Sequence, residues 1–143
     1  MTQSKEIWRK VVILAVVGGL AFWVTNFAIS LTPIAAEYRA ALSISYLPMI
    51  VASLIGGLII GFFVSYFLLR FFDKIPTKNP ILKSVILGFI ALVIVMILIE
   101  VPASLRTSDA LYWFLIGVIF NVPRFFFLGI GIGYLYKRLY ESA

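Results

Sequence analysis

Four long apolar segments, separated by short polar stretches, constrain the fold of this chain more than any other feature. They run from about residues 11 to 31, 47 to 72, 81 to 101 and 110 to 136. A helix needs about 20 residues to cross the hydrocarbon core of a bilayer, and each segment is long enough. We therefore expect an all-α polytopic membrane protein, in which residues 1–143 form a single four-helix transmembrane domain surrounded by lipid.

The composition supports a membrane protein. Hydrophobic residues make up 63% of the chain and charged residues 13%, whereas soluble domains average about 45–50% and roughly 25%. The first apolar segment is longer than the roughly 7–15 residues of a signal-peptide core, so we expect it to be a retained span and not a cleaved leader.

Lysine and arginine residues predict the orientation of the spans. Nine of the 12 lie at the two chain ends and around the loop between the second and third segments. Only Arg39 and Arg106 lie on the other side, and Arg124 belongs to neither. Because short cytoplasmic loops carry the excess of positive charge, we expect both termini to be cytoplasmic, in the cell (inner) membrane of a prokaryote.

The chain contains no cysteine and no histidine. This excludes disulfides, zinc sites built on those residues, haem held by them, Ser-His-Asp triads and cysteine nucleophiles. We expect no metal and no cofactor. The net charge of +6 comes from residues scattered singly at segment ends, so we also expect no nucleic-acid partner.

Residues 32–46 form the longest stretch on the outer side, with Glu37 among alanines. We predict a short interfacial helix there, and a re-entrant segment is the alternative. In the second span, small residues recur at intervals of four and permit close helix packing. This row predicts packing within the bundle, or an interface with a second copy of the chain or another membrane protein; it consists of Ser53, Gly57, Gly61 and Ser65.

Arg124 is the most informative single residue. An arginine at the centre of a span costs at least about 2.5–3.5 kcal/mol, so it normally faces a bundle interior or water. Asn121 lies on the same side of the span. Side chains lean toward the amino end of their own helix, so Arg124 leans outward, while Glu100 and Asn26 lean inward to meet it. We predict an outward-open polar pocket around Arg124, Asn121 and Asn26, with Glu100 as counter-ion and Glu37 closing it from above.

The alternative for Arg124 is a structural clamp, in which it pairs with Glu100 and ties the fourth span to the third. If the cluster is a pocket, an arginine with amide neighbours suits an anionic solute or an acidic lipid headgroup. The sequence then predicts a small transporter, channel or solute-binding membrane protein, most simply a homo-oligomer.

Two other functional classes remain. The chain also fits a non-catalytic structural or assembly subunit of a larger membrane complex, because it has no soluble domain. An intramembrane enzyme would need its few acids, Glu37, Glu100 and Asp109, to hold a divalent ion. Their spacing does not support that chemistry, and we expect that the protein is not an enzyme.

Overall fold

The structure is a computed structural model that describes residues 2–141, with side chains described for residues 5–141. These residues form helices and loops and contain no strand. The all-helical class is therefore confirmed for the described part of the chain. In chain order the elements are α1 (Thr2–Ser30), α2 (Pro33–Ala41), α3 (Tyr46–Arg70), η1 (Phe72–Lys74), α4 (Pro80–Val95), η2 (Met96–Glu100), α5 (Val101–Leu105) and α6 (Ala110–Tyr140).

Four helical stretches are long and apolar enough to cross a membrane. They are Lys5–Ser30, Tyr46–Arg70, Pro80–Leu105 and Ala110–Tyr140. The third joins α4, η2 and α5 into one span. The predicted limits agree with these stretches to within a few residues at most ends, and the stretch predicted as an interfacial helix contains α2.

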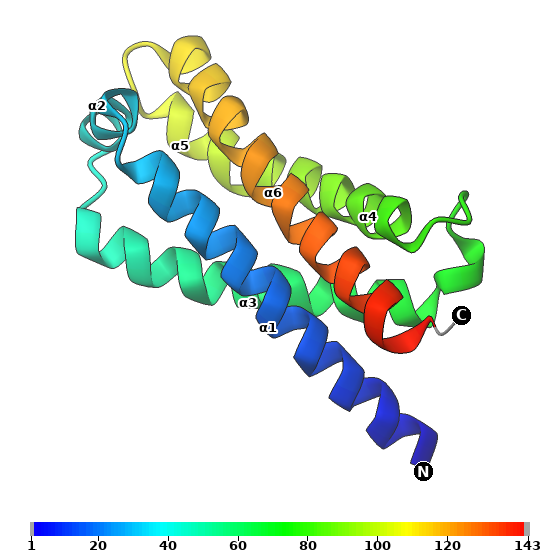
Figure 1. The fold of residues 1–143 in the computed structure, drawn as a ribbon. Helices are drawn as coiled ribbons and strands as arrows, with labels where there is room; N and C mark the ends of the chain where they lie inside the picture. Colours follow the sequence, from blue (N-terminus) through cyan, green and yellow to red (C-terminus); the bar gives the residue numbers. More distant parts are fainter. Residues whose placement is uncertain (1, 142–143) are drawn as a thin grey trace.

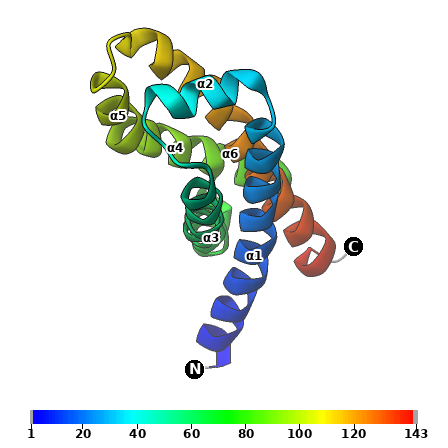
Figure 2. The ribbon, with the colours of Figure 1, turned by 90° about the vertical axis from the view of Figure 1, so that its left-hand side faces the viewer.

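The four spans form an open ring of neighbours. The first span, α1, packs along α3 on one side and α6 on the other, and α6 packs along α4. The remaining pair, α3 and α4, is in contact over a shorter length. The short helix α2 lies across one end of this arrangement, which we call the α2 end (Figures 1 and 2). Both termini lie at the opposite, terminal end (Figure 1), so a membrane crossed by all four spans has both termini on one side.

Glycines allow the backbones of α1 and α3 to meet. A Cβ atom on Gly57 would lie 3.0 Å from the carbonyl oxygen of Gly19, and one on Gly61 would lie 2.8 Å from that of Ala15. A larger residue at either position would press against backbone atoms, which move aside less readily than a side chain does.

The small-residue row of α3 consequently packs within the chain. Gly57 and Gly61 are covered by α1, Ser65 is fully buried, and Ser53 lines a cavity described below. Of the two predicted roles of this row, the structure shows packing within the bundle, since α1 occupies the surface of Gly57 and Gly61.

The contact between α4 and α6 follows the same principle. A Cβ atom on Gly129 would lie 2.9 Å from the Cα atom of Val85, and one on Gly133 would lie 2.6 Å from that of Ile81. These glycines let α6 lie directly on the α4 backbone. Close packing at glycines thus joins α1 to α3 and α6 to α4.

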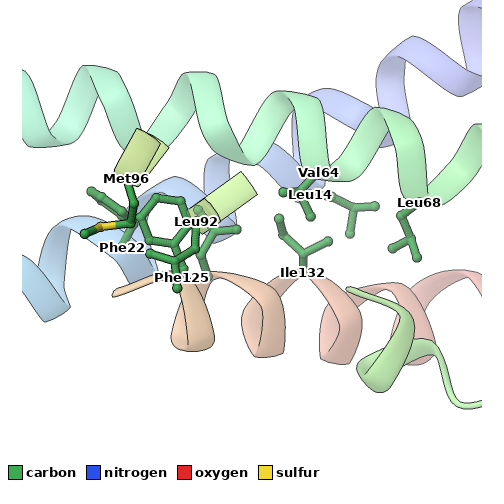
Figure 3. Close-up of a cluster of buried hydrophobic side chains, with 9 residues drawn as sticks. Leu14, Phe22, Val64, Leu68, Leu92, Met96, Phe125 and Ile132 are labelled. Carbon is green, nitrogen blue, oxygen red and sulfur yellow. The ribbon is translucent and has the colours of Figure 1, made fainter. Parts of the chain in front are cut away.

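An apolar core fills the space between the four spans (Figure 3). The rings of Phe22 and Phe125 meet edge to face, with centroids 5.4 Å apart, at the end of this core nearer α2. The buried members of the core are Leu14, Phe22, Val64, Leu68, Leu92, Met96, Phe125, Leu128 and Ile132.

The outward faces of the spans are also apolar. Large hydrophobic side chains are exposed along all four, for example Val24 on α1, Ile55 on α3, Val93 on α4 and Ile119 on α6. Exposed apolar area of this extent is unusual for a soluble monomer, and it is what contact with acyl chains requires.

A buried lysine fixes the loop at the terminal end. Lys83 is 4% exposed, and its Nζ atom donates to the carbonyl oxygen of Phe72. The same ammonium lies 3.5 Å from the centroid of the Phe72 ring. Lys83 therefore joins η1 to the beginning of α4.

Candidate functional site

A cavity of about 370 Å³ lies at the α2 end of the bundle. Its walls come from α1, α3, the span formed by α4, η2 and α5, and α6, while α2 lies over it. Most lining side chains are apolar, as is usual for sites that bind small molecules. The charged residues among them are Arg39, Glu100 and Arg124.

Arg124, on α6, lines the cavity. Its Nη1 atom donates to the side-chain oxygen of Asn121 at 3.1 Å. Its Nε atom is buried and has no hydrogen-bond partner. The guanidinium carbon lies 6.0 Å from the centroid of the Phe120 ring, at the limit of a cation–π contact. The guanidinium therefore keeps unused donors within a protected site.

Glu100 also lines the cavity but does not pair directly with Arg124. Its Oε1 atom accepts from Asn121 at 3.3 Å, and its Oε2 atom accepts from the Tyr38 hydroxyl at 2.6 Å. Among the described side chains, no ion pair joins Arg124 to Glu100; Asn121 connects the two by contacting both. The amide thus acts as a relay between a cation on α6 and an anion on η2.

Two backbone features give Glu100 its position. The turn Met96–Glu100 is π-helical, and the N–H of Val101 donates to the carbonyl of Met96 across this wider turn. Pro102 follows; it has no N–H for the carbonyl of Leu98, and its ring would crowd that carbonyl in a regular helix. Such π turns frequently occur at functional sites.

Gly117 provides the space for the carboxylate. A Cβ atom at this position would lie 2.9 Å from Oε2 of Glu100 and 3.2 Å from the hydroxyl of Tyr38. Gly117 lies one helical turn before Asn121 on α6, so glycine, asparagine and arginine lie on one side of this helix.

Tyr38 reaches the cavity from α2. This helix begins with Pro33 at its first position, and the Thr32 side chain accepts a hydrogen bond from the Ala35 N–H at 3.3 Å. The Tyr38 ring packs edge to face on Phe120, with centroids 5.3 Å apart. Burial, followed by the hydrogen bond to Glu100 and its negative charge, raises the pKa of Tyr38 well above the ordinary tyrosine value.

The opposite wall carries weaker polar contacts. Asn26, which is 2% exposed, donates to the sulfur of Met49 at 3.1 Å. A thioether is a weak acceptor, so the hydrogen bond that the Asn26 amide makes here is weak. Arg39 donates to the carbonyl of Ser30 at 3.4 Å, and its guanidinium carbon lies 4.8 Å from the Tyr46 ring centroid.

The structure brings most of the predicted site together. Arg124, Asn121, Asn26 and Glu100 all line the same cavity. Glu37 is exposed on α2 and does not line it, so this carboxylate does not close the site from above.

Sequence reasoning missed three contributors: Tyr38, Arg39 and Gly117. Tyr38 and Arg39 follow Glu37 directly, but only the placement of α2 shows which side chain of that stretch faces inward. Gly117 lies four residues before Asn121 on the side of α6 that carries Arg124, but the sequence does not indicate that it accommodates Glu100.

Comparisons with known proteins do not place this chain in a family. No family model, no curated protein and no solved structure matches it.

Proposed function

We propose that this protein is an integral membrane protein that binds an anionic group in the cavity at its α2 end, as a small transporter, channel or solute-binding membrane protein. Arg124 is the residue that holds the anion. The observation that carries this proposal is that Arg124 lines the cavity, while in the described structure only its Nη1 atom has a protein acceptor and its Nε atom is buried without one.

The charge of the cavity supports an anionic ligand. Arg39 and Arg124 contribute two positive charges to its walls, and Glu100 contributes one negative charge. The Glu100 carboxylate already accepts from Tyr38 and Asn121. A guanidinium in a partly dry site binds carboxylate or phosphate oxygens through paired, charge-assisted hydrogen bonds.

The pairing of side chains argues against a purely structural clamp. A clamp would bring the guanidinium and the carboxylate into direct contact, since a buried charge left without its partner is strongly destabilising. Here Asn121 lies between them and leaves part of Arg124 available.

Lysine and arginine placement supports an orientation with both termini in the cytoplasm and the α2 end outside, in a prokaryotic inner membrane. The cysteine-free sequence makes this testable. We expect a membrane-impermeant maleimide to label Ser108→Cys, beside the α2 end, in intact spheroplasts, and to label Lys78→Cys only after lysis. The reverse pattern contradicts the orientation.

Anion binding is tested by the thermal stability of the purified protein in a neutral detergent. Two phosphate probes are used, water-soluble glycerol 3-phosphate and the short-chain lipid dihexanoyl phosphatidic acid. A ligand that binds only the folded state raises the midpoint of unfolding as its concentration exceeds its Kd. We expect at least one probe to stabilise the wild type.

The matched variants are Arg124→Gln and Arg106→Gln. Gln at position 124 retains polar atoms near Asn121 but loses the charge, and we expect its Kd to rise about tenfold or more. Arg106 is exposed just after α5 and lies outside the cavity lining, so Arg106→Gln should bind as the wild type does. Equal stabilisation of wild type and Arg124→Gln, or no stabilisation by either probe, overturns the proposal.

A further inference from the structure

Three of the four seams around the cavity are closed by helix packing. Glycines bring α1 onto α3 and α6 onto α4, and α1 packs along α6. The fourth seam, between α3 and the span that ends in η2 and α5, is different. Its helices separate toward the α2 end, as Figure 1 shows.

Side chains at this seam show that the cavity reaches the surface between these helices. Ala52 on α3 and Ile99 on η2 line the cavity from opposite sides, and both are exposed. Gly56, also in the lining, has open space where a Cβ atom would be. We call the gap bounded by Ala52, Gly56 and Ile99 the side opening.

The helix α2 covers the cavity along the bundle axis. It lies across the end of the spans (Figure 2), and Tyr38 and Ala35 from its inward face are buried against the other helices. Tyr38 is further fixed by Glu100 and by edge-to-face contact with Phe120. The side opening therefore lies on the flank of the bundle, beneath this cover.

The surroundings of the side opening are apolar. Ile55 and Ile59 are exposed on α3, and Ile97 and Leu98 are exposed on η2. Both helices belong to stretches that can cross a membrane. In a bilayer, exposed surface at this depth faces acyl chains and not water.

From this geometry we infer that the ligand is an acidic lipid that enters through the side opening, with its anionic headgroup on Arg124 and its chain extending between α3 and η2. The inference rests on the proposed function and names its ligand class. A cavity of about 370 Å³ is at the small end of ligand sites. It suits a headgroup, while the chain is accommodated by the apolar flanks of the opening.

The two phosphate probes of the binding experiment, together with a third probe, separate this inference from anion binding itself. Dihexanoyl phosphatidic acid has both charge and chains, glycerol 3-phosphate has only the charge, and dihexanoyl phosphatidylcholine has chains on a zwitterionic headgroup. Because each buried methylene adds to affinity, we expect the acidic lipid to bind about tenfold or more tightly than glycerol 3-phosphate. We also expect it to bind more tightly than the phosphatidylcholine.

Each result has a distinct meaning. If glycerol 3-phosphate binds as tightly as the acidic lipid, the lipid inference is overturned while anion binding stands. If the two lipids bind equally, the lipid needs no acidic headgroup and the inference is overturned as well. If none of the three binds, the proposed function fails with it.

Closing the side opening tests the entry route. In a cysteine-free chain, Ala52→Cys and Ile99→Cys can be joined across the opening by a bifunctional methanethiosulfonate and released by reduction. We expect the cross-link to slow binding of a fluorescent acidic lipid about tenfold or more, and reduction to restore the rate. Each single-cysteine variant, treated identically, is the control.

A second closure does not depend on cross-linking. Gly56→Phe places a ring in the open space of the side opening, and its unfolding midpoint without ligand reports whether the fold is intact. We expect slowed lipid binding with an unchanged midpoint. Unchanged lipid binding rates in both the cross-linked protein and folded Gly56→Phe overturn the side opening as the entry route.

Discussion

The Nη1 atom of Arg124 lies 3.1 Å from the side-chain oxygen of Asn121, and this contact defines the candidate site. The two residues are three positions apart on α6, so the helix itself places them on one face. Through its amide nitrogen, Asn121 also reaches Glu100 at 3.3 Å. One neutral side chain thereby connects a cation and an anion that belong to different spans.

We predict that Asn121→Leu destabilises the protein. Leucine has a similar size but leaves the guanidinium of Arg124 and one oxygen of Glu100 without a partner. Loss of hydrogen bonds to charged groups costs about 1.5–3 kcal/mol each. The free energy of unfolding in mild detergent measures the change, and a double-mutant cycle with Arg124→Gln should show coupling between the two sites. If the two substitutions change the free energy of unfolding additively, Asn121 does not connect Arg124 to Glu100 energetically.

The Tyr38 hydroxyl should make the stability of the folded protein depend on pH in the alkaline range. Burial and the contact with Glu100 raise the pKa of Tyr38 above its ordinary value of 10.0. Between that value and the folded-state pKa, the folded protein retains a proton that the unfolded chain has lost. This contribution to stability is therefore complete below about pH 10 and declines as the pH rises toward the folded-state pKa.

The matching variant is Tyr38→Phe, which loses the hydrogen bond to Glu100. We expect it to be about 1.5–3 kcal/mol less stable than the wild type near pH 8, with the difference shrinking above pH 10. Unfolding midpoints across this pH range provide the measurement. Tyr112→Phe, at an exposed position near the same end, is the control and should match the wild type throughout. A difference that stays constant up to the highest pH would argue against the raised pKa.

Adding one methyl group should change the free energy of unfolding differently at two nearby positions of α3, Gly61 and Gly56. Gly61→Ala places a Cβ atom 2.8 Å from the Ala15 carbonyl oxygen and forces α1 and α3 apart, for which we expect a loss of about 1–3 kcal/mol. Gly56→Ala meets nothing within 4 Å and should be neutral, or stabilising by up to about 1 kcal/mol because alanine favours helices. Equal effects at the two positions would show that α1 does not pack on this row.

Gly117→Ala should displace the carboxylate without unfolding the bundle. Its Cβ atom would lie 2.9 Å from Oε2 of Glu100, and that flexible side chain can move aside, but then its contact with Tyr38 is lost. Tyr38→Phe should therefore lower the free energy of unfolding by less in Gly117→Ala than in the wild type. Unfolding free energies of the wild type, the two single variants and the double variant measure this difference.

Gly131→Ala is the control for this cycle. It lies on the same helix, and the nearest atom to its added Cβ would be at 3.5 Å, an ordinary contact distance. Tyr38→Phe should cost the same with and without Gly131→Ala. If the cost is also unchanged in Gly117→Ala, the Gly117 position does not control the contact between Tyr38 and Glu100.

The sequence by itself determined the four apolar helices and the polar face of α6. Helix formation across a bilayer depends on local composition, because each span satisfies its own backbone hydrogen bonds and exposes apolar side chains to lipid. The same reasoning showed that Arg124 must face away from lipid and that Asn121 lies beside it.

Only the tertiary structure decided what these faces meet. The contact of Tyr38 with Glu100 joins residues 62 positions apart, and α1 covers Gly57 and Gly61 of α3. The seam between α3 and η2 also separates in a way that no periodicity specifies. Such relationships depend on which backbones approach most closely, and that is settled by packing among all four spans and not by any one of them.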